Sequence, residues 1–437
     1  MSEDDALSNG DGMATSHPGT LGPKLPRKRS WYRTASSVSK KGGDGKAAVA
    51  LEHRHVQVDH PTLRLLRQRI VSKSRPGQRT DPFKLGLVVE GGGMRGCVSG
   101  GGLQALNDLG MRDVFDACYG SSAGAINSTF FLTEQREGVG IYYNHIASEE
   151  FIDLRRLLSR RPGLPPALNL EFLLEHVMER VQPLDWDAVL RSDIPLKVVA
   201  SSLNTLSPVL LEDFADKTDL LSCLRASATV PEVAGGPINH RGHSLVDAAV
   251  FEPVPFRSAV ADGCTHVLVL CTRPAPAHKS PLDQALADAL EAAVKKAVMS
   301  PDYMKPAWQA EVDALMADGL NQDEMLLRSL DEDADSLPWF AGAAVYPLYP
   351  QPSGSSFSPV CTDIQTLKNG VAEGRRAVLT MAQAALGDVV NVTPHLQREA
   401  ANIVPLATRS ASGRAATERL WRRHLAFEDF SHHRTSS

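Results

Sequence analysis

The residue of this chain best suited to nucleophilic chemistry is a serine between two glycines. The motif Gly-x-Ser-x-Gly consists of Gly120, Ser121, Ser122, Ala123 and Gly124. It follows a short apolar run, Phe115–Tyr119, and precedes an apolar helical segment, Ala123–Leu132. At such a strand-to-helix turn the glycines leave room for a strained backbone that presents the serine hydroxyl at the end of the sheet. We therefore predict that Ser122 is a nucleophile that attacks acyl carbonyl groups.

A second glycine-rich turn lies upstream, after the apolar run Leu85–Val89. Its residues Gly91–Gly96 match the dinucleotide-binding pattern Gly-x-Gly-x-x-Gly. That pattern needs an acidic residue at the end of the following strand, whereas Asp116 lies near the start of that strand. A phosphate-binding P-loop is also excluded, because no Gly-Lys-Ser/Thr follows. The turn therefore does not predict a nucleotide site.

The two turns are expected to lie side by side, because the carboxyl ends of neighbouring parallel strands meet at one edge of a sheet. Backbone amides of the first turn would then face Ser122 and donate hydrogen bonds to the oxyanion that forms during acyl transfer. The side chain of Arg95 is able to orient this loop or to meet an anionic group of the substrate. The predicted oxyanion hole comprises Gly91, Gly92, Gly93, Met94, Arg95 and Gly96.

A serine nucleophile needs a base, and the sequence offers an aspartate and several histidines. Asp247 follows the short run 244–246 and is therefore predicted at the sheet edge where ligands bind. Partial burial there is expected to raise its pKa above the ordinary value of about 4 and make it a stronger base. A Ser-His-acid triad stays open as the alternative. Its candidate histidines are His240, His243, His266 and His278.

Together, the motifs resemble those of the patatin-like phospholipases in order and spacing. They are Gly91–Gly96, Gly120–Gly124, the segment ASATVP at 226–231, and Asp247. The similarity extends from about Asp81 to Ala385. It implies a dyad of Ser122 and Asp247, with the first glycine turn as oxyanion hole. It also implies hydrolysis of lipid acyl esters, of phospholipase A or lysophospholipase type, without a metal ion or other cofactor. The implied fold is α/β, with three layers in which helices cover both faces of a mostly parallel central sheet.

The residues after Asp247 depart from the family pattern. The family usually has Asp-Gly-Gly or Asp-Gly-Ala there, whereas Ala248 and Ala249 follow in this chain. If the backbone at Ala248 requires a positive φ, alanine costs about 1 kcal/mol and tilts the carboxylate. A catalytically weakened lipid-binding or regulatory protein is therefore a further alternative.

Alternating apolar strands and helical segments surround the motifs and predict parallel βαβ units. Strands are predicted at 85–89, 115–119, 196–201, 209–213, 244–246, 266–271 and 344–348, and helices at 99–109, 123–132, 221–227, 283–299, 308–328 and 362–385. The predicted organisation is a disordered basic tail over 1–55, a helix and linker over 56–80, the patatin-like domain over 81–387, and a partly helical tail over 388–437.

The charge distribution indicates a basic tail on an acidic body. The chain of 437 residues has a formal net charge of −5, and residues 24–46 contain eight Lys or Arg and one Asp, a local charge of +7 that leaves −12 for the rest. Such a tail is either solvated or docks on an anionic membrane. A secretory signal, a membrane-spanning run and paired cysteines are not found in the sequence. We expect a cytoplasmic protein, at most peripheral at membranes, that acts on lipid and not on nucleic acid.

Overall fold

The computed structural model describes residues 57–158, 163–275, 322–330, 340–350, 357–387, 389, 390 and 393. The predicted N-terminal tail, residues 1–55 with the basic segment 24–46, lies outside these residues. So do His278, the predicted helix 283–299 and nearly all of the predicted C-terminal tail, 388–437. Among the described residues, no helix combines the length and apolarity needed to cross a membrane.

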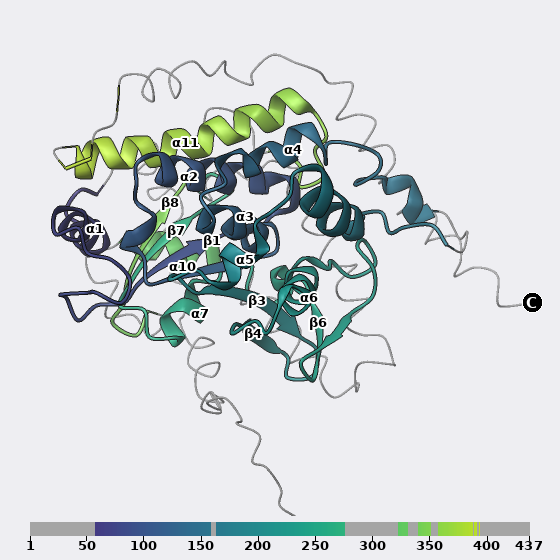
Figure 1. Ribbon diagram of the computed structural model, residues 1–437, viewed down its shortest axis with the longest axis horizontal. Coiled ribbons are helices and arrows are strands. Elements are labelled where there is room, and N and C mark those ends of the chain that lie inside the picture. The colour runs from purple at the N-terminus through teal and green to yellow at the C-terminus, as the bar shows by residue number, and fades with distance from the viewer. Residues whose placement is uncertain are drawn as a thin grey trace, which may run out of the picture. The chain divides into compact units, whose positions relative to one another are not determined.

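Eight strands form one mixed sheet within the described part of the chain (Figure 1). They are β1 (Leu85–Val89), β2 (Ala117–Ser121), β3 (Leu196–Ser202), β4 (Ser207–Leu211), β5 (Ile238–His240), β6 (His243–Val246), β7 (His266–Leu270) and β8 (Ala344–Leu348). Their order is β5-β6-β3-β2-β1-β7-β8, and β4 pairs with β3 off this path. The row from β3 to β8 is parallel, whereas β4, β5 and β6 pair in antiparallel fashion. The predicted mostly parallel sheet is confirmed.

Helices cover both faces of this sheet. The main ones are α1 (Pro61–Val71), α2 (Gly96–Asp108), α3 (Ala123–Leu132), α6 (Lys217–Ala228), α7 (Phe256–Ala261), α10 (Gln322–Arg328) and α11 (Ile364–Leu386). Shorter ones are α4 (Ile141–Asn144), α5 (Trp186–Leu190), the π-helix η7 (Phe172–Val181) and the 3-10 turns η3 (Gly93–Arg95), η4 (Arg112–Val114), η5 (Arg136–Gly140), η6 (Leu154–Leu158) and η8 (Ala248–Val250).

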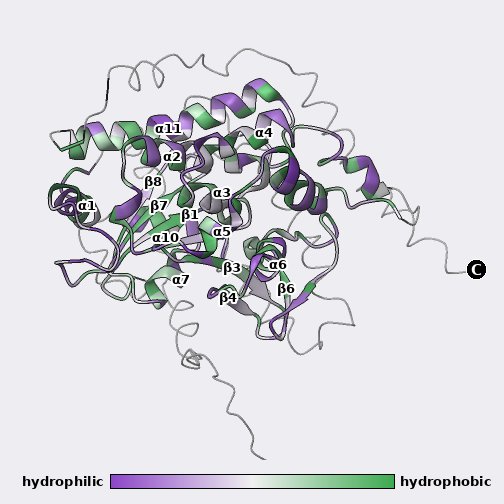
Figure 2. Ribbon diagram, in the orientation of Figure 1, coloured by the Kyte–Doolittle hydropathy of each residue, from purple (hydrophilic) through white to green (hydrophobic). Residues whose placement is uncertain are grey.

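The side chains of β1 alternate between two hydrophobic cores, as the period of a strand requires. Leu85, Leu87 and Val89 pack into a core shared with α2, α3 and α11, whereas Val88 packs into a second core shared with α7 and α10. In Figure 1, α2 and α11 lie on one side of the sheet and α7 on the other. Figure 2 shows the same arrangement by hydropathy, with apolar strands inside and helices of mixed character outside. The fold has the three expected layers.

Helices α2 and α11 cross in very close contact, which only glycine permits. A Cβ added to Gly374 would lie 1.8 Å from the carbonyl oxygen of Val98, and one added to Gly101 would lie 2.0 Å from that of Val371. Because α2 starts at the first glycine-rich turn, α11 holds the helix that carries this turn against the sheet.

A buried cluster of ion pairs fixes α1 to the amino-terminal edge of the sheet. The guanidinium of Arg69, whose side chain is fully buried, binds Asp81 at 2.8 Å and Asp116 at 2.7 Å. Arg79 binds the other oxygen of Asp116 at 2.6 Å, and the amide of Leu85 also donates to this carboxylate. Asp116, just before β2, therefore has partners that serve the fold, consistent with the exclusion of a ribose-binding role.

Several predicted elements shift in the structure. The second strand occupies Ala117–Ser121 and not 115–119, so it runs into the serine motif itself. Helix α6 starts at Lys217, four residues before the predicted start, because Asp216 caps it by accepting from the amide of Asp219. The strand predicted at 244–246 is β6, and its hairpin partner β5 was not predicted. Of the predicted helix 308–328, only α10 lies within the described residues.

Candidate active site

The two glycine-rich turns meet at the carboxyl edge of the sheet. Val89 of β1 pairs with Gly120 of β2, so the turns that follow these strands are neighbours. A Cβ added to Gly91 would lie 2.9 Å from Cβ of Ser122, and one added to Gly124 would lie 2.2 Å from the carbonyl oxygen of Val89. Any side chain at these two positions would collide with the opposite turn. The glycines therefore allow the first turn to pass directly over the serine.

Ser122 has the strained backbone expected of a nucleophile on a sharp turn. Its φ of 50° and ψ of −124° lie outside the regions that residues with a side chain normally adopt. A conformation of this kind costs about 1 to 3 kcal/mol and persists only where neighbours hold it. Ser227 supplies one such contact: its hydroxyl accepts from the amide of Ser122 at 2.8 Å and donates to the carbonyl of Val199 at 2.6 Å.

Asp247 lies within hydrogen-bond distance of the serine. The hydroxyl of Ser122 donates to Oδ2 of Asp247 at 2.8 Å, and the amide of Ala249 donates to Oδ1, also at 2.8 Å. The amide of Asp247 itself donates to the carbonyl of Thr229. The ASATVP segment therefore holds both members of the pair, Ser122 through Ser227 and Asp247 through Thr229. Sequence reasoning noted this segment but did not predict its contacts.

Burial shapes the titration of Asp247. The residue is only 2% exposed. Burial raises the pKa of its carboxyl group to about 6, although the hydrogen bonds from the Ala249 amide and the Ser122 hydroxyl favour the charged form and oppose this rise. A carboxylate with this pKa is a stronger base than an ordinary aspartate and is still mostly ionised at neutral pH.

The alanines after Asp247 do not strain the site. Neither Ala248 nor Ala249 is among the residues with positive φ. They open the short turn η8, which Asp247 caps through the bond from the Ala249 amide. The left-handed backbone that would have made Ala248 costly is therefore not required in this chain.

Only part of the predicted oxyanion loop has amides available for a ligand. The Gly91 amide donates to the Ser121 hydroxyl at 3.1 Å, and the Met94 amide donates to the carbonyl of Pro359 at 2.9 Å. The amides of Arg95 and Gly96 bond within the turn itself. The amides of Gly92 and Gly93 donate to no acceptor within the described residues. Both residues have positive φ, 126° and 58°.

The first serine of the motif connects three loops. The hydroxyl of Ser121 accepts from the amide of Gly91 and donates to the carbonyl of Pro253 at 2.6 Å. Pro253 belongs to the loop that follows Asp247. Ser121 is 1% exposed, so these bonds are protected from water. A single buried hydroxyl therefore sets the oxyanion loop, the serine turn and the base loop relative to one another.

The three candidate histidines within the described residues have other neighbours. Nε2 of His240 lies 2.7 Å from Asp219, and Nδ1 of His243 lies 3.0 Å from the hydroxyl of Ser202. His266 pairs with Leu85 at the start of β7, at the end of the sheet opposite to the glycine turns. Within the described part of the chain, none of the three forms a hydrogen bond with Ser122, whose hydroxyl donates to Asp247; His278 lies outside that part.

One group of side chains in the described residues has donor atoms close enough to share a metal ion: Asp219, Cys223 and His240. The carboxylate of Asp219 is already bound by the guanidinium of Arg241. A cation in direct contact with the carboxylate opposes the binding of a second one, so this group does not favour a metal site.

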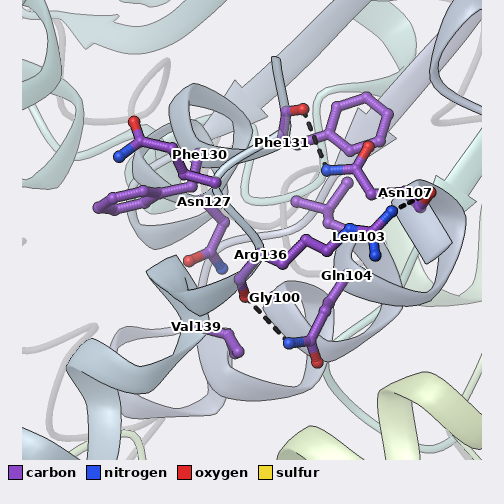
Figure 3. A pocket seen from close by; sticks show the side chains of 10 residues that line it. Gly100, Leu103, Gln104, Asn107, Asn127, Phe130, Phe131, Arg136 and Val139 are labelled. Carbon is purple, nitrogen blue, oxygen red and sulfur yellow. Dashed lines mark hydrogen bonds between the residues drawn. The ribbon is translucent and has the colours of Figure 1, made fainter. Parts of the chain in front are cut away.

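A small cavity lies between α2, α3 and η5, lined by Leu103, Asn107, Phe130 and Val139 among others (Figure 3). Its volume of about 20 Å³ leaves room for about one water molecule and is far too small for an acyl chain. Figure 3 shows Asn107 donating to the carbonyl of Phe131 beside it. No residue of the two glycine-rich turns lines this cavity.

Comparison with known proteins agrees with these motifs. The family model of Patatin-like phospholipase matches residues 87–260, a range that includes both glycine turns and Asp247. The chain contains a patatin-like phospholipase domain. A curated relative, the uncharacterized protein YjjU of Escherichia coli K12, is 27% identical over 204 residues, which are 46% of this chain and 55% of that protein. The chain thus spans about half the length of this relative.

Solved structures that are similar to this chain include one human and one bacterial protein. Human GIVD cytosolic phospholipase A2, in complex with methyl gamma-linolenyl fluorophosphonate, has a TM-score of 0.41 and 14% identity over 82% of this chain and 65% of that one. VipD from Legionella pneumophila has a TM-score of 0.28 and 12% identity over 78% of this chain and 84% of that one.

Proposed function

We propose that this protein is a serine hydrolase that cleaves fatty acyl esters of lipids, with phospholipase A or lysophospholipase activity. The observation that carries the proposal is the hydrogen bond of 2.8 Å from the strained Ser122 to the buried Asp247. A strained serine beside a carboxylate of raised pKa is the arrangement that nucleophilic catalysis needs. The patatin-like phospholipase match supports lipid esters as the substrate class.

In the proposed reaction, Asp247 takes the proton of Ser122 while the hydroxyl oxygen attacks the ester carbonyl carbon. The carbonyl oxygen becomes negatively charged and accepts hydrogen bonds from the amides of Gly92 and Gly93. The carbon–oxygen bond to the alcohol breaks, and the alcohol leaves with the proton held by Asp247. Asp247 then takes a proton from water as the water oxygen attacks the acyl-serine; the bond from the carbonyl carbon to Oγ of Ser122 breaks, Asp247 returns the proton to Oγ, and the fatty acid leaves. Two amide donors stabilise such an oxyanion by several kcal/mol.

The proposed oxyanion hole has two residues, fewer than the six predicted from the sequence. Gly91 and Met94 use their amides to fix the loop, and only the amides of Gly92 and Gly93 are left to bind substrate. The weakened-protein alternative depended on strain at Ala248, and no positive φ occurs there. The triad alternative depended on a histidine beside Ser122. Of its candidates within the described residues, His240 bonds to Asp219, His243 bonds to Ser202, and His266 lies at the opposite edge of the sheet.

The test is covalent labelling followed by a panel of lipids. Purified full-length protein is treated with a fluorophosphonate and the labelled residue is located by mass spectrometry. Phosphatidylcholine, lysophosphatidylcholine and triacylglycerol are then offered separately. We expect labelling at Ser122 and fatty acid release from at least one lipid, both abolished by Ser122→Ala. The variant Ser222→Ala, which changes a serine on α6, serves as control. Folded wild-type protein that is not labelled at Ser122 contradicts the proposal.

A further inference from the structure

The residue before the oxyanion loop is held by an ion-pair network whose other members lie 183 or more residues further along the chain. Glu90 directly precedes Gly91, and its carboxylate is 5% exposed. One oxygen accepts from the amide of Thr272 at 2.6 Å, and the other binds the guanidinium of Arg273 at 2.8 Å. The remaining nitrogens of Arg273 form two bonds of 2.9 Å with both oxygens of Asp323 on α10.

A second contact ties the same two segments together at the loop itself. The hydroxyl of Thr272 donates to the carbonyl of Gly91 at 2.9 Å. Since the carbonyl of Gly91 and the amide of Gly92 belong to one planar peptide unit, this bond also fixes the direction of the Gly92 amide. Glu90 and Gly91 are thus held from outside, on the side away from Ser122.

The Arg273 guanidinium is well suited to this task. Its planar fork bonds two carboxylates at once, in fixed directions, which a lysine ammonium cannot do. Its side chain is 27% exposed and that of Asp323 is 17% exposed, so both ion pairs are largely shielded from water and salt. Both residues lie beyond the range 87–260 that the family model matches.

We propose that Arg273 and Asp323 are positioning residues that hold the oxyanion loop in its working geometry through Glu90. The proposal rests on the proposed acyl hydrolysis at Ser122. The amides of Gly92 and Gly93 act on charge that develops only during the reaction, so a shift of the loop weakens transition-state binding more than substrate binding. A displacement of about 1 Å at a catalytic group costs about 100-fold in rate.

A positioning role and a purely structural role of this network have different effects on the kinetics. A network that only stabilised the protein would change the melting temperature and the fraction of folded enzyme, but every folded molecule would turn over at the wild-type rate. A positioning network changes kcat per active site and leaves KM nearly constant. Active-site titration with a fluorophosphonate supplies the number of competent serines, and so gives kcat per site.

The experiment compares Arg273→Met, Arg273→Lys and Asp323→Asn in the full chain, with a soluble ester as substrate. We expect kcat per titrated site to fall about 100-fold for Arg273→Met and about 10-fold for Asp323→Asn, with KM within about twofold of wild type. Arg273→Lys keeps the charge without the fork and falls between wild type and Arg273→Met. Arg225→Met is the matched control: its side chain has the same exposure, 27%, and pairs with Glu175.

The proposal is overturned if Asp323→Asn and Arg273→Met both keep the wild-type kcat per site, even if their melting temperatures are lower. Should Arg273→Met not fold, the isosteric Asp323→Asn decides alone. A wild-type protein that is neither labelled nor active contradicts the hydrolase itself, and this inference with it. That result is distinct from an active wild type with unaffected variants, which removes only the positioning role.

Discussion

Burial has two opposite consequences for Asp247. It raises the pKa of the carboxyl group to about 6, which strengthens the group as a base. It also means that the ionised form is held in a place that disfavours charge. Within the described residues, two hydrogen bonds oppose this penalty, from the Ser122 hydroxyl and the Ala249 amide. The residue that acts as base in the proposed reaction is therefore one that destabilises the folded protein at neutral pH.

The first prediction concerns the pH dependence of the reaction. Since Asp247 must be ionised to accept a proton, kcat/KM for a soluble ester should rise with pH to a plateau, with a midpoint near the pKa of about 6. Rates measured between pH 4 and pH 9 check this, together with rates of labelling by a fluorophosphonate. A midpoint near 4 contradicts the burial of the base. A midpoint that moves when a histidine is replaced restores the triad.

The second prediction concerns stability. The carboxyl pKa is about 6 in the folded protein and 3.8 in a model compound, so between these values the folded state holds a proton that the unfolded chain has lost. The free energy of unfolding therefore falls as the pH rises from about 4 to 6, by about 2 to 3 kcal/mol, and stays lower above that range. Asp247→Asn cannot titrate and escapes this loss. It should be inactive yet more stable than wild type at pH 8.

Urea unfolding of both proteins at pH 4 and pH 8 checks the second prediction, because the difference between them cancels the titration of all shared groups. We expect the advantage of Asp247→Asn to be larger at pH 8 than at pH 4. Asp187→Asn, at a side chain that is 75% exposed, is the control and should show little change between the two pH values. An equal difference at both pH values would mean that Asp247 titrates as an exposed aspartate does.

At the scale of elements, the crossing of α2 and α11 leads to a third prediction. Alanine in place of Gly374 has the better helix propensity, by about 1 kcal/mol. Its Cβ, however, would lie 1.8 Å from the backbone oxygen of Val98, which cannot move aside as a side chain can. We expect Gly374→Ala to lower the free energy of unfolding by about 2 kcal/mol or more, because overpacking outweighs propensity. Gln383→Ala, at an exposed position of α11, should stay within about 0.5 kcal/mol of wild type. Stabilisation by Gly374→Ala in urea melts would refute this crossing.

The elements that sequence reasoning found are those with a local signal. The runs Leu85–Val89 and Val267–Cys271 are free of polar side chains, as buried parallel strands often are, and the glycine motifs mark the turns beside β1 and β2. The β5–β6 hairpin lacked such a signal. Its two-residue turn consists of Arg241 and Gly242, both with positive φ, and arginine is not a residue that predicts this turn type.

The site shows the same limit. Ser122 and Asp247 stand at strand ends in recognisable motifs, so their meeting could be expected. The bonds of Ser121, Ser227 and Arg273 depend on contacts between segments far apart in the chain, which no local periodicity encodes. A usable signal did exist for one of them: Arg273 follows the strand 266–271 at the carboxyl edge, where polar residues often serve the site.

At the scale of the whole molecule, the two edges of the sheet have different tasks. Ser122, Asp247 and the oxyanion loop lie at the carboxyl edge, whereas Arg69 and Asp116 lie at the amino edge. The amino edge contains no group of the proposed reaction. Its buried ion pairs join α1 to β1 and β2 and so connect the segment before the domain to its sheet.

The last prediction follows from this division. Arg69→Met removes the partner of two carboxylates; Asp116 keeps Arg79, but Asp81, 3% exposed at its side chain, is left without its bidentate partner. Breaking a buried ion pair from one side costs about 3 to 5 kcal/mol, so the free energy of unfolding should fall by that amount. The kcat per fluorophosphonate-titrated site should nevertheless stay at the wild-type value. Arg191→Met, whose side chain is 72% exposed, is the control and should change stability by less than about 1 kcal/mol. A loss of kcat per site in Arg69→Met would show that the two edges are coupled, and that α1 belongs to the catalytic apparatus as well as to the fold.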